Sequence, residues 1–487
     1  MAAHKGMLCR AITGNMEKYE LVAGFETHVE LATDTKIFCG CTTKFGGEPN
    51  THTCPVCTGM PGALPRINRK AVEYTIMAGL ATNGKINNLS KMDRKNYFYP
   101  DLPKAYQVSQ FERPLSIGGY IELDSGKRIR INHIHLEEDA GKLVHKGGKT
   151  YIDYNRGGVP LMEIVSEPDI RSIEEGIEYL EKLQMIMRYI GVSDCKMQEG
   201  SMRCDVNISV RPAGSEEFGI RSEIKNMNSF AHIAKAMEYE YNRKVDAAEN
   251  GEILPQETRR YNETTGETEG MRTKEDAHDY RYFLEPDLVP MKISDEEIEN
   301  IKNALPQLPA ERIKRYISEY GLSDVDAKNI AKYKNVADFF EGAAELVKNP
   351  KTVSNMIITQ IFSSLGTEEE KEACRLKITP KQLSELINLL DAGEINSSTA
   401  KKALSKMLET GKSAEEVIPK DQMGGLSDEE LNKLVQEAVS QCQPAVNDYL
   451  AGKEKAIKAV VGYVMKQSRG KADAAKAEQM IIEIVKK

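Results

Sequence analysis

The stretch RCDVNISVRP, residues 203–212, indicates the fold class because its polar and apolar residues alternate without a break. Alternate residues of an extended strand point to opposite faces of a sheet. One face would then carry four apolar side chains, namely Cys204, Val206, Ile208 and Val210. The segment PAGSEEFG turns the chain back into IRSEIKN, so we expect an antiparallel hairpin with one apolar and one polar face.

Similar alternation, broken by Gly, Pro and Asn, recurs up to about residue 290. A helix is predicted within this part at SIEEGIEYLEKLQMIMRYIG, residues 172–191, where the final glycine can end it. After residue 290 a helical period dominates, beginning with the capping pattern SDEE at 294–297. We therefore expect an α+β fold in three parts: an antiparallel-sheet domain at 1–292, an all-α domain at 293–419 and a small α-helical tail domain at 420–487.

The charge of the chain is distributed unevenly. Its 487 residues include 66 basic and 74 acidic ones, for a net charge of −8, which argues against a surface covered by positive potential. The last 35 residues, Lys453 to Lys487, nevertheless hold nine basic and four acidic residues. This end of the chain could accept a polyanion such as a nucleic acid; the alternative is a solvated face on a terminal helix.

Targeting and redox signals point to the cytoplasm. The N-terminal MAAHKGMLCRAITGNMEKYE lacks the apolar run of a secretory signal, and no later run approaches the ~18 apolar residues that span a bilayer. The nine cysteines are an odd number in a long chain, which argues against a disulfide framework. In a reducing cytoplasm, clustered cysteines more often bind metal.

Four cysteines cluster in FCGCTTKFGGEPNTHTCPVCTGMPG, residues 38–62. Two pairs are separated by twelve residues: Cys39 with Cys41, and Cys54 with Cys57. Glycines and a proline supply the tight turns that let four thiolates converge as tetrahedral ligands. We predict a structural zinc site. Four reduced thiols in a loop are the alternative, and His52 could replace one ligand.

Acidic residues recur on the predicted strands. In LVAGFETHVEL, residues 21–31, Phe25 and its alternate neighbours share one face, and Glu26, His28 and Glu30 share the other. Further acids follow along the chain, namely Glu137, Glu138, Asp139, Glu163, Glu167, Asp169, Glu199, Asp205 and Glu223. Carboxylates gathered on one sheet repel each other unless a hard cation such as Mg²⁺ lies between them. We predict a magnesium-nucleotide site, whereas surface ion pairing is the alternative for each acid taken alone.

The common phosphate-binding loops are missing from the sequence. No P-loop and no G-x-G-x-x-G after a strand is found, so nucleotide phosphates would meet side chains such as Lys95, Arg203 and Lys225. The loop KMDRKNYFYPDLPKAYQ, residues 91–107, interleaves basic and aromatic residues. It could stack a base or an acceptor end, or it could simply pack on the sheet.

Nine segments occur in a fixed order: GFETHVEL, FCGC with CPVC, DRKNYFYPDLPKAYQ, HLEEDAGK, NRGGVPLMEIVSEPD, EGSMRCDVNISV, EIKNMNSF, QETRRYN and DYRYFLEPDL. Together they closely resemble the B subunit of the aspartyl/glutamyl-tRNA amidotransferases. The resemblance covers the chain from about Tyr19 and is strongest in its N-terminal half. It implies a cradle domain related to the glutamine synthetase catalytic fold, then a helical domain, then a tail domain that binds tRNA.

The resemblance also implies a reaction. ATP would phosphorylate the side-chain carboxylate of glutamate on tRNA(Gln) or of aspartate on tRNA(Asn), and ammonia would displace the phosphate. A glutaminase partner, the A subunit, would supply the ammonia, and the small C subunit would join the assembly. Phosphoryl transfer relies on metal ions and cationic side chains rather than on a protein nucleophile, which agrees with the residues found here.

Residue by residue, the resemblance assigns a catalytic site to Glu26, His28, Glu138 and Glu163, with the last three as magnesium ligands. It assigns nucleotide or phosphate contacts to Glu199, Arg203, Asp205, Glu223 and Lys225, to which the basic loop adds Lys95. Two other functions remain open. A non-catalytic tRNA-presenting scaffold would lack the metal acids, and a stand-alone ligase acting on free glutamate would lack the basic tail.

Overall fold

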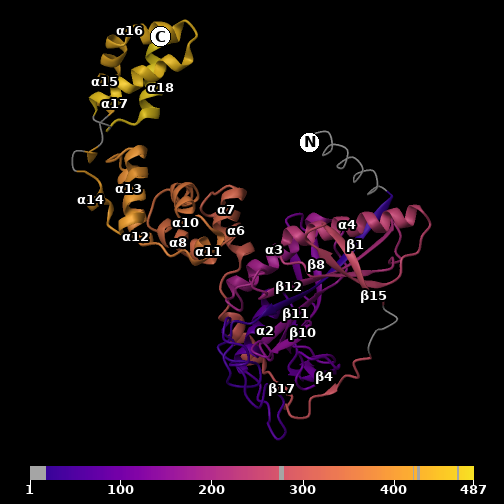
Figure 1. The fold of residues 1–487 in the computed structure, drawn as a ribbon. Helices are drawn as coiled ribbons and strands as arrows, with labels where there is room; N and C mark the ends of the chain where they lie inside the picture. The colour runs from indigo at the N-terminus through magenta and orange to yellow at the C-terminus, as the bar shows by residue number, and fades with distance from the viewer. Residues whose placement is uncertain (1–17, 274–278, 420–421, 425–427, 469–470, 487) are drawn as a thin grey trace. The chain divides into compact units, whose positions relative to one another are not determined.

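The structure, a computed structural model, describes residues 18–273, 279–419, 422–424, 428–468 and 471–486. The chain divides into two compact units, Met1–Leu308 and Pro309–Lys487 (Figure 1). Among the described residues, all strands belong to the first unit, and the second is helical. The α+β class and the helical C-terminal region are confirmed.

A ten-stranded sheet forms the frame of the first unit, in the order β15-β14-β13-β12-β1-β11-β8-β6-β2, with β7 paired to β8. Its strands are β1 (Tyr19–Glu30), β2 (Lys85–Ile86), β6 (Ser116–Ile117), β7 (Tyr120–Glu122), β8 (Arg128–Glu138), β11 (Pro160–Ser166), β12 (Met202–Pro212), β13 (Ser222–Lys225), β14 (Glu257–Asn262) and β15 (Glu267–Thr273). The sheet is mixed rather than purely antiparallel, because β13 and β14 run parallel. Helix α4 (Phe230–Glu249) connects them, and a helical crossover is what brings two strands into parallel pairing.

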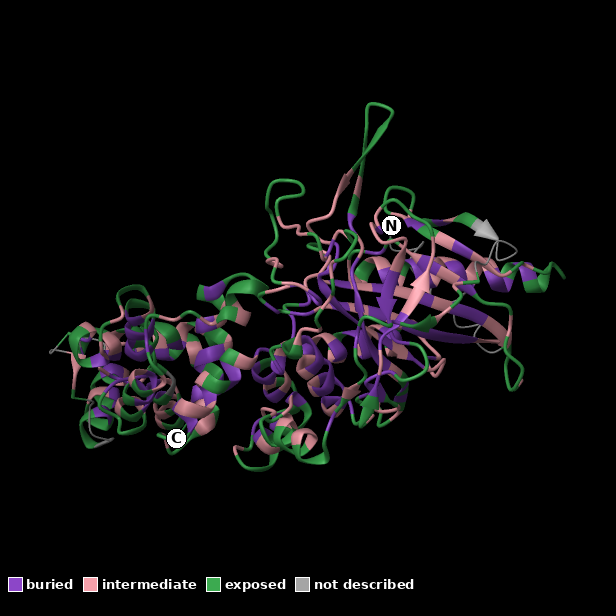
Figure 2. Ribbon diagram, turned by 90° about the horizontal axis from the view of Figure 1, so that it is seen from below, coloured by how far each residue is buried: buried purple, intermediate pink, exposed green. Residues whose placement is uncertain are grey.

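Three smaller sheets accompany the large one. They pair β3 (Leu89–Ser90) with β17 (Met291–Lys292), β9 (Lys142–Lys146) with β10 (Lys149–Asp153), and β4 (Asp93–Asn96) with both β5 (Tyr106–Ser109) and β16 (Phe283–Leu284). Figure 2 shows that the strands of the large sheet are mostly buried, whereas loops and hairpin tips around it are exposed.

The central strands β1 and β12 follow the alternation of the sequence. Phe25, Val29 and Cys204 are buried in the core, while Glu26 and Asp205 lie on the opposite face and are half-buried. β1 pairs with β12 in antiparallel register along eleven residue pairs, from Tyr19↔Pro212 to Val29↔Met202. The predicted hairpin is confirmed as well, because β12 pairs antiparallel with β13.

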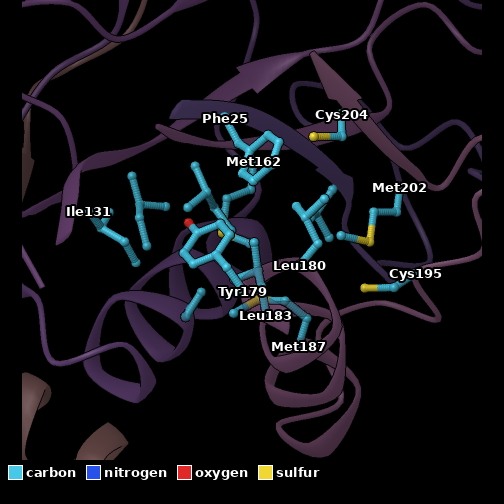
Figure 3. Close-up of a cluster of buried hydrophobic side chains, with 14 of the residues drawn as sticks. Phe25, Ile131, Met162, Tyr179, Leu180, Leu183, Met187, Cys195, Met202 and Cys204 are labelled. Atoms are coloured by element: carbon cyan, nitrogen blue, oxygen red, sulfur yellow. The ribbon is translucent and has the colours of Figure 1, made fainter. Parts of the chain in front are cut away.

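Helices cover the apolar face of the sheet. They are α2 (Arg69–Ala81), α3 (Ile173–Tyr189) and α4, with α5 (Asp295–Asn303) packed on α2. The Tyr179 ring of α3 stacks on Phe25 of β1 at 5.8 Å between centroids (Figure 3). Fully burying a side chain such as Phe25 contributes roughly 2–3 kcal/mol. Gly176 permits this approach, because a Cβ there would lie 3.1 Å from Phe25 Cζ.

Helix boundaries follow local capping chemistry. The Ser172 side chain accepts a hydrogen bond from the Glu175 amide at the start of α3, and Gly191 with φ +71° follows its end, as predicted. Ser294 accepts from the Glu297 amide at the start of α5, which confirms the predicted helix start.

The second unit contains only helices among its described residues. They are α6 (Pro309–Ser318), α7 (Asp324–Ala331), α8 (Lys334–Ala344), α9 (Pro350–Met356), η2 (Ile357–Ile361), α10 (Phe362–Leu365), α11 (Glu368–Ala373), α12 (Pro380–Asp391), α13 (Ser397–Thr410), α14 (Ala414–Val417), α15 (Asp428–Gln441), α16 (Gln443–Leu450), η4 (Glu454–Ala456), α17 (Ile457–Gln467) and α18 (Ala474–Val485). Their apolar residues form two clusters, one between Tyr316 and Ile418 and one between Leu431 and Ile481. The predicted boundary at 420 lies outside the described residues. None of the described helices combines the length and the apolar character needed to cross a membrane.

Candidate functional site

Five neighbouring strands, β13, β12, β1, β11 and β8, present polar side chains on the sheet face opposite α3 and α4. The register aligns them. His28 of β1 lies opposite Glu163 of β11, and Glu163 lies opposite His135 of β8. On the other side of β1, Glu26 lies opposite Asp205 of β12. We call this surface the polar face.

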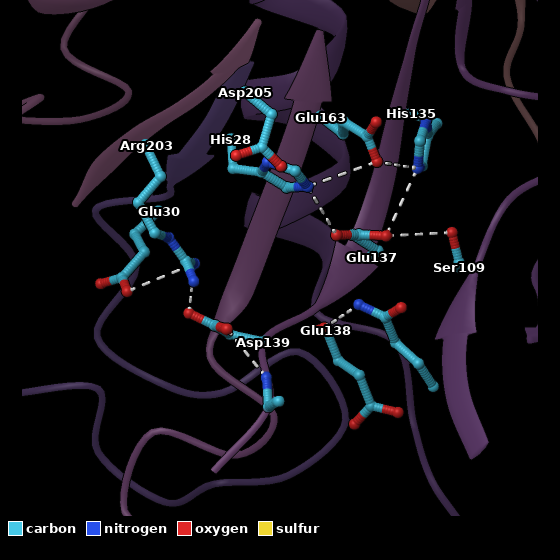
Figure 4. A network of polar contacts seen from close by, with 12 residues as sticks. His28, Glu30, Ser109, His135, Glu137, Glu138, Asp139, Glu163, Arg203 and Asp205 are labelled. Carbon is cyan, nitrogen blue, oxygen red and sulfur yellow. Dashed lines mark hydrogen bonds and ion pairs between the residues drawn. The ribbon is translucent and has the colours of Figure 1, made fainter. Parts of the chain in front are cut away.

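Two imidazoles and two carboxylates meet at its centre (Figure 4). His28 Nε2 lies 3.4 Å from Glu163 Oε2 and 3.6 Å from Glu137 Oε1. His135 Nε2 lies 3.3 Å from the same Glu163 oxygen and 3.4 Å from Glu137 Oε2. One ligand atom from each of His28, Glu137 and Glu163 lies within 4.8 Å of the others, so the three could hold a divalent cation.

Positive charge on the imidazoles offsets these carboxylates. Burial works to lower the pKa of His135, but its contacts with Glu137 and Glu163 outweigh burial and raise that pKa to about 9. Burial likewise opposes ionisation of Glu163, but His135 and His28 outweigh it and hold the pKa of Glu163 well below its ordinary value. The carboxylates of Glu137 and Glu163 therefore favour a positive charge between them, at the centre of the polar face.

A second acidic group lies beside the first. One oxygen from each of Glu26, Asp205 and Glu223 lies within 4.8 Å of the others. The Lys225 ammonium pairs with Asp205 and lies 2.8 Å from Glu223 Oε1, and Asn207 Nδ2 donates to Glu26 Oε1 at 2.9 Å. Burial, then the charges of Glu163 and Glu223, raise the pKa of Glu26. Two of the three carboxylates thus share one ammonium, and the third, Glu26, has only a neutral donor, an arrangement that a further cation would stabilise.

A charged corner closes one end of the polar face. Arg203 Nη2 lies 2.5 Å from Asp139 Oδ2 and 3.9 Å from Glu30 Oε1, and Arg156 Nε lies 3.5 Å from the same Asp139 oxygen. Burial, then the charge of Asp139, raise the pKa of Glu30 to about 8. Arg203 Nε is buried and has no hydrogen-bond partner among the described residues.

The four cysteines converge at one point. One sulfur from each of Cys39, Cys41, Cys54 and Cys57 lies within 4.8 Å of the others. A hydrogen bond from Cys39 lowers the pKa of the Cys57 thiol to about 4, and the same bond raises the pKa of Cys39. These sulfurs fit the tetrahedral ligand set of zinc. The ring of His52 lies against Gly47 and is not part of this group.

A cavity of about 410 Å³ opens next to the second acidic group. Its walls come from β1, β11, β12 and the loop between β12 and β13, and they include Val22, Glu26, Val165, Asn207, Phe218 and Ile220. Phe218 and Ile220 are large apolar side chains that remain exposed at this cavity. Apolar walls with a few polar groups at one end are typical of pockets for flat organic ligands.

Comparisons with known proteins identify the family of this chain. A family model described as the GatB/GatE catalytic domain matches residues 21–299, and one described as the GatB domain matches residues 338–485. The B subunit of the aspartyl/glutamyl-tRNA(Asn/Gln) amidotransferase of Thermoanaerobacter sp. (strain X514) is 52% identical over 475 residues, which cover 96% of this chain and 100% of that protein. This chain belongs to the amidotransferase B-subunit family. The B subunits of Caldanaerobacter subterraneus subsp. tengcongensis and Persephonella marina are 51% and 48% identical, with the same coverage.

The fold brings together several residues that the resemblance to the B-subunit family assigns to the site. Glu26, His28 and Glu163 lie on the polar face with Asp205, Glu223 and Lys225, and Arg203 lies at its corner. Lys95 also lies near this surface. The charges of Glu137 and Glu163 reach it, outweigh the effect of burial and raise the pKa of Lys95.

Two assigned residues lie elsewhere. Glu138 is buried with both carboxylate oxygens on Lys104 Nζ, at 2.6 and 2.7 Å, and Oε1 also accepts from the Val108 amide at 2.8 Å. Glu199 is a surface residue paired with Lys196 at 2.9 Å. The position that the resemblance gives to Glu138 in the metal group is occupied in this chain by its neighbour Glu137.

Sequence reasoning missed His135 of the central group, and it named Glu137 among the acids without assigning it to the site. A signal was available in INHIHLEED, where alternation puts His133, His135 and Glu137 on one face of β8 and Glu138 on the other. The strand signal there is weaker than in β1, because the polar residues of that segment are not evenly spaced.

Proposed function

We propose that this chain is the subunit of a tRNA-dependent amidotransferase that activates the side-chain carboxylate of Glu-tRNA(Gln) or Asp-tRNA(Asn) with ATP and then amidates it. The observation that carries the proposal is the pair of adjacent acidic groups on the polar face, His28 with Glu137 and Glu163, and Glu26 with Asp205 and Glu223. The names of the relatives, which are B subunits of such enzymes, support the same function.

The two groups suit hard divalent cations. Their donors are carboxylate oxygens and one imidazole, which match Mg²⁺ better than a soft metal. Magnesium bound there would neutralise charge on a transferring phosphoryl group. The acids of the polar face would hold the ions, while Lys225, Lys95 and the partly exposed guanidinium of Arg203 would bind phosphate oxygens.

The neighbouring cavity suits the nucleoside part of ATP. It adjoins Glu26, so a base held between Phe218 and Val22 would have its phosphates directed toward the second acidic group. Asn207 lies at the same junction and donates to Glu26, which keeps that carboxylate in place. In the reaction, the substrate carboxylate oxygen would attack the terminal phosphorus and ADP would leave. Ammonia would then attack the acyl carbon, phosphate would depart with the bonding electrons, and ammonia would lose a proton.

An aromatic row beside the site suits the acceptor end of tRNA. Tyr97 contacts Tyr280, Tyr280 contacts Tyr282, and Tyr282 stacks on Phe111 at 4.5 Å between centroids. The Lys95 ammonium lies 4.9 Å from the Tyr280 ring centroid. Aromatic rings next to a cation are the usual means of holding unpaired nucleotides. The terminal nucleoside, which carries the amino acid, would rest here with its side chain toward Glu137 and Glu163.

The remaining assignments complete the proposal. The sheet domain at 1–292 would be a cradle related to glutamine synthetase, the domain at 293–419 a helical spacer, and the domain at 420–487 the tRNA-binding tail. The glutaminase partner, the A subunit, would supply ammonia, and the small C subunit would join them in the cytoplasm. Zinc at the four cysteines would be structural, because four sulfurs leave no open coordination position.

The test is phosphate release from ATP by the reconstituted complex, with mischarged tRNA, uncharged tRNA or free glutamate as the acceptor. We expect release only with mischarged tRNA. Release with free glutamate would instead identify a stand-alone ligase. Absence of release with every acceptor, while mischarged tRNA still binds, would identify a tRNA-presenting scaffold.

A further inference from the structure

A lysine is buried beside the four cysteines. Lys36 has only 1% of its surface exposed, and its Nζ lies 3.8 Å from Cys57 Sγ and 3.1 Å from the Tyr154 carbonyl oxygen. Lysines are almost never fully buried unless their charge is compensated. The environment of Lys36 must therefore supply negative charge.

No carboxylate supplies it. In the parts of the chain that the structure describes, Lys36 forms no ion pair with a carboxylate, and the polar contacts of its ammonium are the Cys57 sulfur and one carbonyl. A neutral thiol and a carbonyl offer only partial charges. Of the two polar contacts that Lys36 makes among the described residues, only Cys57 can carry a full negative charge, as a thiolate.

The four-cysteine group has a net negative charge when it holds a divalent metal ion. Four thiolates around one divalent ion leave an excess of two negative charges. Because this excess sits in a half-buried loop, a nearby ammonium lowers its electrostatic cost. Contacts of this kind, from groups next to metal ligands, also hold the ligands in position.

The same lysine touches the turn that leads into the polar face. A Cβ placed on Gly158 would lie 3.6 Å from Lys36 Cδ and 4.0 Å from Glu138 Oε2. The Ile37 amide donates to the Gly158 carbonyl, and the Gly158 amide donates to the Asp139 carbonyl, both at 2.9 Å. The turn from Tyr154 to Gly158 is thus held between two segments. One is the cysteine loop, residues 38–62, which carries the four cysteines, and the other is Asp139 of the charged corner.

We propose that Lys36 is the counter-ion of the metal-loaded four-cysteine site, and that its contacts with Cys57 and Tyr154 fasten the turn at 154–158 to that site. Lys36 is a positioning residue in this role. The inference rests on the proposed zinc occupancy, and it goes beyond a structural zinc site by naming the charge partner and the segment that depends on it.

The test uses the reconstituted complex with Lys36→Met, Lys36→Arg and, as a matched control, Lys44→Met, which removes an exposed lysine between the same cysteine pairs. Zinc release to a chromogenic chelator is the first readout. We expect release to become roughly 10- to 100-fold faster in Lys36→Met, to be largely restored in Lys36→Arg, and to be unchanged in Lys44→Met.

Two further readouts separate a charge contact from simple packing. In cobalt-substituted protein, the sulfur-to-cobalt absorption should shift in Lys36→Met, and amide exchange at Ile37 and Gly158 should accelerate. Wild-type release rates and an unchanged cobalt spectrum in Lys36→Met would overturn the inference, as would equal effects of Lys44→Met. A wild-type complex that retains no zinc would overturn the zinc site itself. If Lys36→Met fails to fold, faster zinc release with a shifted spectrum in Lys36→Gln supports the inference, and wild-type values there overturn it.

Discussion

At the scale of single residues, the adjacent acids Glu137 and Glu138 lie on opposite sides of the same strand and have different partners. Glu137 faces His28 and His135 on the polar face, whereas Glu138 points the other way and pairs with Lys104. Neighbouring residues on a strand differ in direction by about 180°. Their roles should therefore be separable by substitution although both are buried acids.

We expect Glu137→Gln to lower tRNA-dependent phosphate release at least about 100-fold, because it removes one charge from a proposed magnesium site. Glu138→Gln is the matched control. The Glu138→Gln substitution weakens the ion pair with Lys104 and should lower thermal stability. It should reduce phosphate release less than Glu137→Gln does.

Phosphate release by the complex measures both variants, and glutamine hydrolysis by the glutaminase partner should be unaffected in each. Full activity in Glu137→Gln would remove Glu137 from the metal site. A complete loss of phosphate release in Glu138→Gln alone would identify Glu138 as the metal ligand, as the resemblance to the family implies.

Phe218 offers a second test at this scale. Its side chain is 64% exposed at the proposed nucleoside cavity, where stacking on a base is worth about 1 kcal/mol. We expect Phe218→Ala to raise the Michaelis constant for ATP about fivefold without changing the turnover number. Phe45→Ala, which removes an exposed ring from the cysteine loop, serves as the control and should leave both constants unchanged.

At the scale of secondary-structure elements, α4 contributes a buried basic residue that contacts the loop before β13. Lys244 donates to the Ile220 carbonyl oxygen at 2.9 Å and lies 3.9 Å from Glu240. Burial lowers its pKa to about 8 from an ordinary value of 10.5, although Glu240 opposes the shift. Between these two pH values the unfolded chain binds a proton at this position that the folded chain does not.

The free energy of unfolding should therefore rise with pH at this position, by up to about 3 kcal/mol between pH 8 and pH 10.5. Below pH 8 the folded protein bears the full cost of the buried charge. The measurement is denaturant unfolding of wild type and Lys244→Met over this pH range, since the difference between them cancels other titrating groups. A difference that stays constant with pH would show that Lys244 keeps its proton in the folded state.

At the scale of the whole molecule, the C-terminal helices hold an apolar cluster of their own between Leu431 and Ile481. That cluster shares no residue with the core of the sheet domain. Removal of this segment should therefore leave the polar face intact. The basic residues after Lys453 are the sequence feature that suits tRNA phosphates.

We expect truncation at residue 419 to raise the Michaelis constant for tRNA at least about tenfold, which corresponds to about 1.4 kcal/mol of binding. ATP affinity of the truncated chain in the complex should be unchanged. The salt dependence of tRNA binding should also weaken, because fewer phosphates are neutralised. Equal tRNA affinity before and after truncation would refute a role for the tail.

Some of this organisation follows from local rules that the sequence displays. The alternation around Phe25 and Val206 predicted which faces of β1 and β12 are buried, and Ser172 and Gly191 marked the ends of α3. The cysteine spacing predicted their convergence, which four sulfurs within 4.8 Å bear out. The parallel pairing of β13 with β14 was missed, because it depends on how α4 crosses the sheet.

The amino-acid sequence by itself determined the α+β class, the alternation of the central strands and the family, because periodicity, capping and ordered motifs act between near neighbours in the chain. Only the tertiary structure decided that Glu137 and His135 join His28, that Glu199 stays at the surface, and that Lys36 lies buried against Cys57. Those outcomes depend on which strands pair and on packing between segments tens of residues apart, and the alternation within one strand does not specify its partner strand.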